Sequence, residues 1–171
     1  MAPEIAGELA LLAQCVAPSP RRLVPAADIH LTLVPPWSEA SIPDAVAKLS
    51  RALERFGCFS LSFERLCYGP APRRPHMLWA ECAPNAEIVA LRNALLSAFG
   101  QESDRPFRPH VTLARIGING RRAAEKKPVN QTLCLTQPVD SVDLFRSPMP
   151  GESGYAVVSS LPLKHVVTTR G

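Results

Sequence analysis

The chain has 171 residues, of which 46% are hydrophobic and 20% are charged, and its net charge is +4 at pH 7. This composition is typical of a folded domain with a real core and excludes an intrinsically disordered chain. A charge of +4 is below that of a dedicated duplex-DNA binder, although it suits a basic cleft for a phosphorylated ligand.

From the sequence we expect neither a secretory signal nor a membrane-spanning segment. No apolar run is long enough to span a bilayer, and the start of the chain has two acids, Glu4 and Glu8, but no basic leader. We therefore expect a cytoplasmic protein with no membrane partner. The five cysteines are scattered and include no C-x-x-C pair, which predicts core thiols rather than a disulfide framework or a zinc site.

Three segments have the apolar spacing of amphipathic helices. The first covers residues 3–15, where Pro3 suits the first turn. The second covers residues 43–56, and the third covers residues 85–99 with Asn85 as its N-cap.

Alternating apolar and polar residues predict strands between these helices. We expect residues 117–127 to form an exposed basic loop. Because helices and strands mix without a regular β-α-β order, the pattern predicts an α+β fold with largely antiparallel sheets. The predicted strands cover residues 28–34, 59–63, 77–82, 110–115, 131–145 and 155–163.

A four-residue motif, H-x-T-L, occurs once in each half of the chain. It covers residues 30–33 and residues 110–113, and the two copies use half of the four histidines. On a strand, residues i and i+2 share a face, so each copy places an imidazole beside a hydroxyl. If the two strands lie in facing lobes, His30, Thr32, His110 and Thr112 converge on one cleft.

This group of side chains suits acid–base chemistry at a phosphorus atom. Opening a cyclic phosphodiester needs a base to activate water and an acid to protonate the leaving oxygen, and two imidazoles supply both. The hydroxyls can hydrogen-bond the phosphate oxygens, so the scheme needs no metal and no cofactor. Two alternatives remain: packed or surface histidines, and a metal site, for which Asp28 is the one nearby acid.

Several residues near the motifs have two interpretations. Arg115 follows the second motif with a strand parity opposite to that of Thr112, and it is either a phosphate or ribose ligand or a solvated charge. Arg108 could steer RNA or be an ordinary loop charge. Trp79 could stack on a base or pack in the core.

The flanks LVPAADIHLTLVPPW and RPFRPHVTLARI, with the segment HMLWAEC, resemble the 2H phosphoesterase superfamily. The nearest branch is similar to the RNA 2′,3′-cyclic phosphodiesterases, also called 2′-5′ RNA ligases. The resemblance spans nearly the whole chain. It implies a single bilobal α+β domain over residues 1–171, with two mostly antiparallel sheets, outer helices, a central cleft and pseudo-twofold symmetry.

The same resemblance implies an activity. Thr32 and Thr112 are expected to line the cleft with His30 and His110, of which His110 is the base and His30 the acid, or the reverse. Apart from the resemblance, we expect Thr32, Thr112 and Arg115 to bind substrate. The substrate would be a 2′,3′-cyclic phosphate end of RNA or a small nucleotide, the product a 2′-phosphate, and the enzyme a monomer. Two other hypotheses stay open: a nucleotide- or RNA-binding module with little turnover, and a 2′-5′ RNA ligase.

Two departures from the family pattern affect these expectations. Family members usually begin with a strand before their first helix. Here the helix expected over residues 3–15 matches that first helix directly, so the strand is missing or replaced, or the full protein begins upstream. Residues 34–37, VPPW, replace an F-L-G-like segment. This second departure concerns the choice of substrate more than the chemistry.

Overall fold

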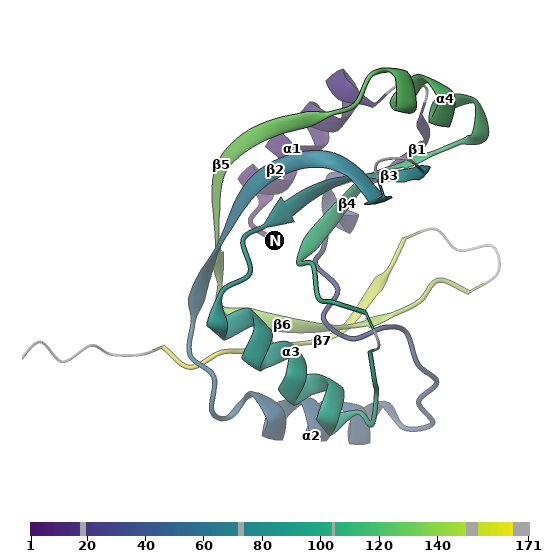
Figure 1. Cartoon of the computed structure of the whole chain (residues 1–171). Helices are drawn as coiled ribbons and strands as arrows, with labels where there is room; N and C mark the ends of the chain where they lie inside the picture. The colour runs from purple at the N-terminus through teal and green to yellow at the C-terminus, as the bar shows by residue number, and fades with distance from the viewer. Residues whose placement is uncertain (18–19, 72–73, 104, 150–153, 166–171) are drawn as a thin grey trace, which may run out of the picture. The chain divides into compact units, whose positions relative to one another are not determined.

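A computed structural model describes residues 1–17, 20–71, 74–103, 105–149 and 154–165 (Figure 1). The chain divides into two compact units. The first unit comprises Met1–Thr32, Leu61–Pro84 and Arg108–Gln137, and the second comprises Leu33–Ser60, Asn85–Phe107 and Pro138–Gly171. Both expected histidine motifs therefore place their His and Thr in the first unit.

The first unit is built on a five-stranded sheet in the order β1-β4-β3-β2-β5. Strand β4 is antiparallel to both of its neighbours, β1 and β3, and β3 is antiparallel to β2. Fully buried Val111 and Leu113 on β4 help to form the core of this unit. The strands are β1 (Pro20–Leu23), β2 (Phe59–Ala71), β3 (Arg74–Cys82), β4 (His110–Ile116) and β5 (Asn130–Val139).

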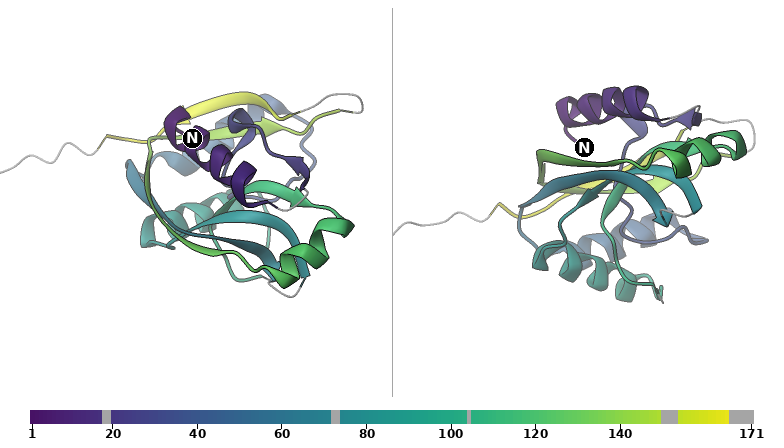
Figure 2. Two further views of the ribbon diagram at one scale, coloured as in Figure 1. Left: turned by 90° about the horizontal axis from the view of Figure 1, so that it is seen from above. Right: turned by 45° about the horizontal axis from the view of Figure 1, so that its top comes forward.

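Helix α1 (Pro3–Val16) confirms the first predicted helix almost residue for residue. Its buried Ala6, Leu9 and Ala13 lie one turn apart, which is the spacing of a single apolar face. The helix packs against β1, β4 and the short 3-10 helix η1 (Ala26–Asp28), and Figure 2 shows it running along one side of the sheet.

Residues 28–34 do not form the predicted strand. The 3-10 helix η1 ends at Asp28, and within the described chain only Leu31 then makes a β-bridge, to Val111 on β4. Prolines flank this segment on both sides, at residue 25 and at residues 35 and 36. Because proline has no backbone N–H, it cannot donate to a strand ladder, and the alternating pattern therefore yields one bridge instead of a strand.

The predicted basic loop over residues 117–127 is also wrong, because Ile118–Lys126 form helix α4. This helix packs beside β3 through small buried residues, Gly120 and Ala124, which lie one turn apart. Sequence periodicity finds helices by their bulky apolar residues, and the single bulky apolar residue of α4, Ile118, points to solvent.

The second unit pairs two helices with a two-stranded antiparallel sheet, β6 (Ser141–Arg146) and β7 (Ala156–Pro162). Helix α2 (Ile42–Leu53) packs on helix α3 (Ala86–Ala98). The predicted N-cap of α3 is confirmed, since Oδ1 of Asn85 accepts from the Ile88 N–H at 2.9 Å. The core of this unit is formed by Leu49, Leu53, Leu91, Leu95 and Leu163.

The described residues thus form an α+β fold with two antiparallel sheets and four α-helices, which confirms the expected fold class. The predicted strand over residues 131–145 is interrupted at Asp140, where β5 gives way to β6. Within the described ranges, no helix combines the length and the apolar character needed to cross a membrane.

Candidate functional site

The two motifs lie side by side in the first unit. Leu31 and Val111, the middle residues of the two H-x-T segments, form an antiparallel bridge. In an antiparallel register the flanking residues face one another crosswise, so His30 lies across from Thr112, and Thr32 across from His110. The four motif side chains share the face opposite Leu31 and Val111. They come together by pairing within one unit rather than from facing lobes.

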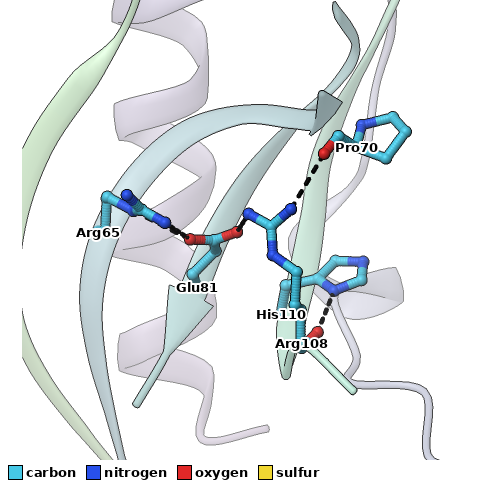
Figure 3. Close-up of polar contacts among 5 residues, drawn as sticks. All are labelled: Arg65, Pro70, Glu81, Arg108 and His110. Carbon is cyan, nitrogen blue, oxygen red and sulfur yellow. Dashed lines mark hydrogen bonds and ion pairs between the residues drawn. The ribbon is translucent and has the colours of Figure 1, made fainter. Parts of the chain in front are cut away.

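His110 begins strand β4 and its ring orientation is fixed by the backbone. Its Nδ1 lies 2.7 Å from the carbonyl oxygen of Arg108, two residues earlier (Figure 3). A carbonyl oxygen only accepts hydrogen bonds, so Nδ1 must carry the proton and donate it. The neutral ring of His110 then has its lone pair on Nε2, which is the arrangement a general base needs.

His30 has the same local hydrogen bond. Its Nδ1 lies 2.7 Å from the carbonyl oxygen of Asp28, again two residues earlier, at the end of η1. The same reasoning assigns the proton to Nδ1. Asp28 therefore contacts His30 through its backbone carbonyl. Among the described residues, no three His, Cys, Asp or Glu side chains gather into a metal-ligand set.

The indole of Trp79 packs against the imidazole of His110. The two rings are stacked, with centroids 3.7 Å apart and planes inclined by 23°. Trp79 is only 5% exposed, so it supports the imidazole rather than offering an open surface for a base. On β2, Gly69 makes room for this indole, because a Cβ at residue 69 would overlap the Trp79 ring.

A buried carboxylate lies beside the same histidine. Glu81 is 8% exposed, stands opposite His110 in the β3–β4 register, and is ion-paired with Arg65 and Arg108 (Figure 3). Burial opposes ionisation of Glu81, but the hydrogen bond from Arg65 and the charges of both guanidiniums outweigh it and hold its pKa below the ordinary value. Glu81 is therefore an anion at neutral pH.

The protonation of His110 is set by opposing effects. Burial lowers its pKa below 6.5, and the charge of Arg108 acts in the same direction. The hydrogen bond to the Arg108 carbonyl and the negative charge of Glu81 act in the opposite direction but do not reverse the shift. At neutral pH the imidazole of His110 is therefore mostly neutral and able to accept a proton.

The two threonines differ in exposure. Thr112 is half-buried, and its hydroxyl lies 3.8 Å from the sulfur of Met77 on β3. Thr32 is exposed. Both hydroxyls stand next to a motif histidine and across from the other one, where each can donate a hydrogen bond to an anionic oxygen.

Arg115 lies on the same face as Thr112, against the parity that the sequence predicts. In the β3–β4 register Trp79 pairs with Thr112 and Leu78 pairs with Ala114, so the ladder shifts by one residue at Leu113. Such a bulge reverses the parity of the residues that follow it. Arg115 therefore stands opposite Met77, on the side of the motif hydroxyl, and it is exposed.

Sequence reasoning missed Glu81 as a site residue and did not separate the two interpretations of Arg108. The alternation in HMLWAEC does hold a signal, because Trp79 and Glu81 share a strand face while Leu78, Ala80 and Cys82 share the other. An acid on the same face as a buried indole needs a cationic partner. The partners come from residues 65 and 108, which no local pattern connects.

The sequence model of the 2′-5′ RNA ligase superfamily matches residues 4–147 of this chain. The matched region includes both H-x-T-L motifs, the Glu81 ion pairs and Arg115. No curated protein shows significant sequence similarity to the chain.

Solved structures share the fold over nearly the full length. The crystal structure of TT0787 of Thermus thermophilus is 25% identical, covers 97% of this chain and 95% of its own, and has a TM-score of 0.74. E. coli LigT complexed with phosphate is 21% identical, with coverages of 96% and 93% and a TM-score of 0.72. LigT complexed with 3′-AMP is 23% identical, with coverages of 95% and 93% and a TM-score of 0.67.

Proposed function

Because this chain belongs to the 2′-5′ RNA ligase superfamily, we propose that it hydrolyses 2′,3′-cyclic phosphate ends of RNA or nucleotides to 2′-phosphates. The observation that carries the proposal is the antiparallel bridge between Leu31 and Val111. This register supports a site in which two imidazoles and two hydroxyls surround a single phosphate. The reaction we propose needs no metal, since proton transfer to and from the two histidines drives it.

In the proposed mechanism His110 is the base. Its Nε2 takes a proton from water, and the water oxygen attacks phosphorus as the bond from phosphorus to the 3′-oxygen breaks. His30, as an imidazolium, gives its Nε2 proton to that leaving oxygen, which becomes the 3′-hydroxyl. The phosphate remains on the 2′-oxygen. The lowered pKa of His110 supports this assignment, because a base must be unprotonated at the start.

Three side chains are proposed to bind the phosphate. The hydroxyls of Thr32 and Thr112 would donate hydrogen bonds to its non-bridging oxygens, where negative charge grows in the transition state. Arg115 would add a fixed positive charge from the same sheet face. LigT has been solved with phosphate, 3′-AMP, ATP and NADP+, which supports nucleotides as the ligand class to test here.

The direct test of the proposed hydrolysis identifies the phosphate product by 31P NMR. The purified protein is incubated in EDTA with 2′,3′-cyclic AMP or with an RNA ending in a 2′,3′-cyclic phosphate, and 31P NMR identifies the product. We expect the 2′-phosphate isomer alone, with 3′,5′-cyclic AMP left intact. Activity that appears only when a divalent metal is restored would overturn the proton-transfer scheme.

Two other functions are outcomes of the same experiment. Tight nucleotide binding without turnover of any cyclic phosphate would indicate a binding module. Joining of a cyclic-phosphate RNA end to a 5′-hydroxyl RNA end would indicate a 2′-5′ RNA ligase, because the same two histidines can activate a 5′-hydroxyl in place of water and protonate the leaving 3′-oxygen. The superfamily's name makes this second assay necessary.

A further inference from the structure

We infer that Glu81 is a positioning residue for His110: it fixes Arg108, and the backbone carbonyl of Arg108 fixes the tautomer of His110. The inference rests on the proposed function for its effect on catalysis. The hydrogen-bond chain itself can be tested without any substrate. Figure 3 shows the residues of this hydrogen-bond chain, from Arg65 through Glu81 and Arg108 to His110.

The first link is the burial of Glu81. A carboxylate that is 8% exposed is costly unless cations neutralise it, so Glu81 strongly favours positions of Arg65 and Arg108 that bring their guanidiniums against it. Nε of Arg65 donates to one carboxylate oxygen at 2.9 Å, and the guanidinium of Arg108 donates to the other. Each oxygen thus has its own cationic donor.

The second link is the guanidinium of Arg108, which is held at three points. It donates to Glu81, it donates to the carbonyl oxygen of Pro70 at 3.0 Å, and its Cζ lies 5.5 Å from the centroid of the Trp79 ring. A planar guanidinium matches this arrangement because its donors point in fixed directions. The side chain of Arg108 therefore anchors residue 108 to both β2 and β3.

The third link is the backbone between Arg108 and His110. Pro109 is buried, its ring restricts φ, and its carbonyl oxygen accepts from the Cys82 N–H at 2.9 Å. The described residues just before this tripeptide, 105–107, form no helix or strand. The anchored Arg108 side chain is therefore what restrains the near end of the tripeptide, where the carbonyl that accepts from His110 lies.

The consequence concerns one proton. The two neutral tautomers of an imidazole differ little in free energy, so a single hydrogen bond decides which of them predominates. If the Arg108 carbonyl moves, the proton can pass to Nε2, and that nitrogen then has no lone pair with which to accept a proton from water. We expect a loss of kcat with little change in KM, because substrate contacts are untouched.

The test is Glu81→Gln, with Glu39→Gln as its matched control. Glu39 is the other described ion-paired glutamate, bound to Lys48 at 3.4 Å in the second unit. Ring nitrogens labelled with 15N report the tautomer of each histidine by NMR. In E81Q we expect His110 to shift toward the Nε2–H form while His30 keeps the wild-type signals, and kcat to fall about tenfold or more. E39Q should match wild type in both measurements.

A second variant tests the same ion pair in case the Glu81→Gln protein does not fold. Arg108→Gln removes the same ion pair from a side chain that is 47% exposed, so the fold should survive. If Glu81 acts through Arg108, the double variant E81Q/R108Q will lose no more kcat than R108Q alone. Losses that multiply, or an unchanged His110 tautomer in folded E81Q or R108Q, would overturn the inference. The NMR result decides the matter even if the wild type hydrolyses no cyclic phosphate.

Discussion

His30 and His110 share a motif and a first hydrogen bond, but the backbone that carries them differs. His110 begins a seven-residue strand that is paired with β3 on one side and β1 on the other. His30 follows a 3-10 turn on a segment that makes one isolated bridge. Nδ1 donates to the carbonyl two residues earlier at 2.7 Å in both cases. The same hydrogen bond thus forms on two different backbones, and it does not require the histidine to lie in a paired strand.

The comparison also separates the two histidines by their surroundings. His110 is stacked on a buried indole and lies opposite a buried anion. A ring held in this way keeps its pKa low, chiefly because burial disfavours the charged form. This environment suits a base, which must start neutral, and it places the acid role on His30 in the proposed reaction.

The largest expected effect comes from removing either imidazole. We expect His30→Ala and His110→Ala each to lower kcat for 2′,3′-cyclic AMP by about 10²–10⁴-fold, because each removes one proton transfer. The double variant should be little worse than either single one, since an acid and a base working as a unit are not additive. Steady-state kinetics on folded proteins measures this, and His76→Ala on β3 is the matched control.

Unequal activities of the two alanine variants would show that His30 and His110 do not act together. Should one of the two alanine variants retain full activity while its circular dichroism spectrum stays native, only the other histidine would belong to the site.

Substitutions of Thr32 and Thr112 test whether the two His–Thr pairs contribute equally to catalysis. We expect Thr112→Val and Thr32→Val to lower kcat by up to about 100-fold each, because each removes a donor to the charged transition state. Thr136→Val, at an exposed position of β5, is the control and should not change the rate. Loss in one variant alone would show that the phosphate is bound by only one motif.

A smaller effect is expected from disturbing the packing of Trp79, the ring stacked on His110, through the neighbouring Gly69, with Gly7 as the control. Gly69→Ala places a methyl group where it overlaps the buried Trp79 ring, and we expect it to destabilise the fold by about 1–3 kcal/mol and to reduce activity. Gly7→Ala, within α1, meets no atom within 4 Å and should stabilise by about 0.5–1 kcal/mol without changing activity. Chemical denaturation measures both. An activity loss in G7A, or native stability in G69A, would contradict the packing described here.

The sequence predicts those elements whose signals are local. Helix α3 follows from its apolar spacing and from the cap at Asn85, and β4 follows from the alternation of polar and apolar residues over 110–113. Helix α4 escapes prediction because it packs through Gly120 and Ala124, which carry no apolar periodicity. The expected strand around His30 fails because the prolines at residues 25, 35 and 36 remove ladder donors on both sides.

The candidate site divides in the same way. The motif residues are visible in sequence because the His and Thr of each motif are two positions apart, which is the spacing of one strand face. The parity of Arg115 is not, because it depends on a one-residue shift of the ladder at Leu113. The role of Glu81 depends on partners 16 and 27 positions away, Arg65 and Arg108. Such contacts are fixed by tertiary pairing of strands rather than by spacing.

The most direct test of the account compares the pKa of His110, measured by NMR in the free enzyme, with the pKa of the essential base, measured from the pH profile of kcat/KM. A base works only when neutral, so kcat/KM falls as the pH drops through its pKa, and a lowered pKa moves this fall to lower pH. NMR titration gives the pKa of each histidine, and the pH profile of kcat/KM gives that of the essential base. We predict that the acid limb coincides with the titration of His110, below pH 6.5. An acid limb that follows His30 instead, or no acid limb at all, would contradict the account.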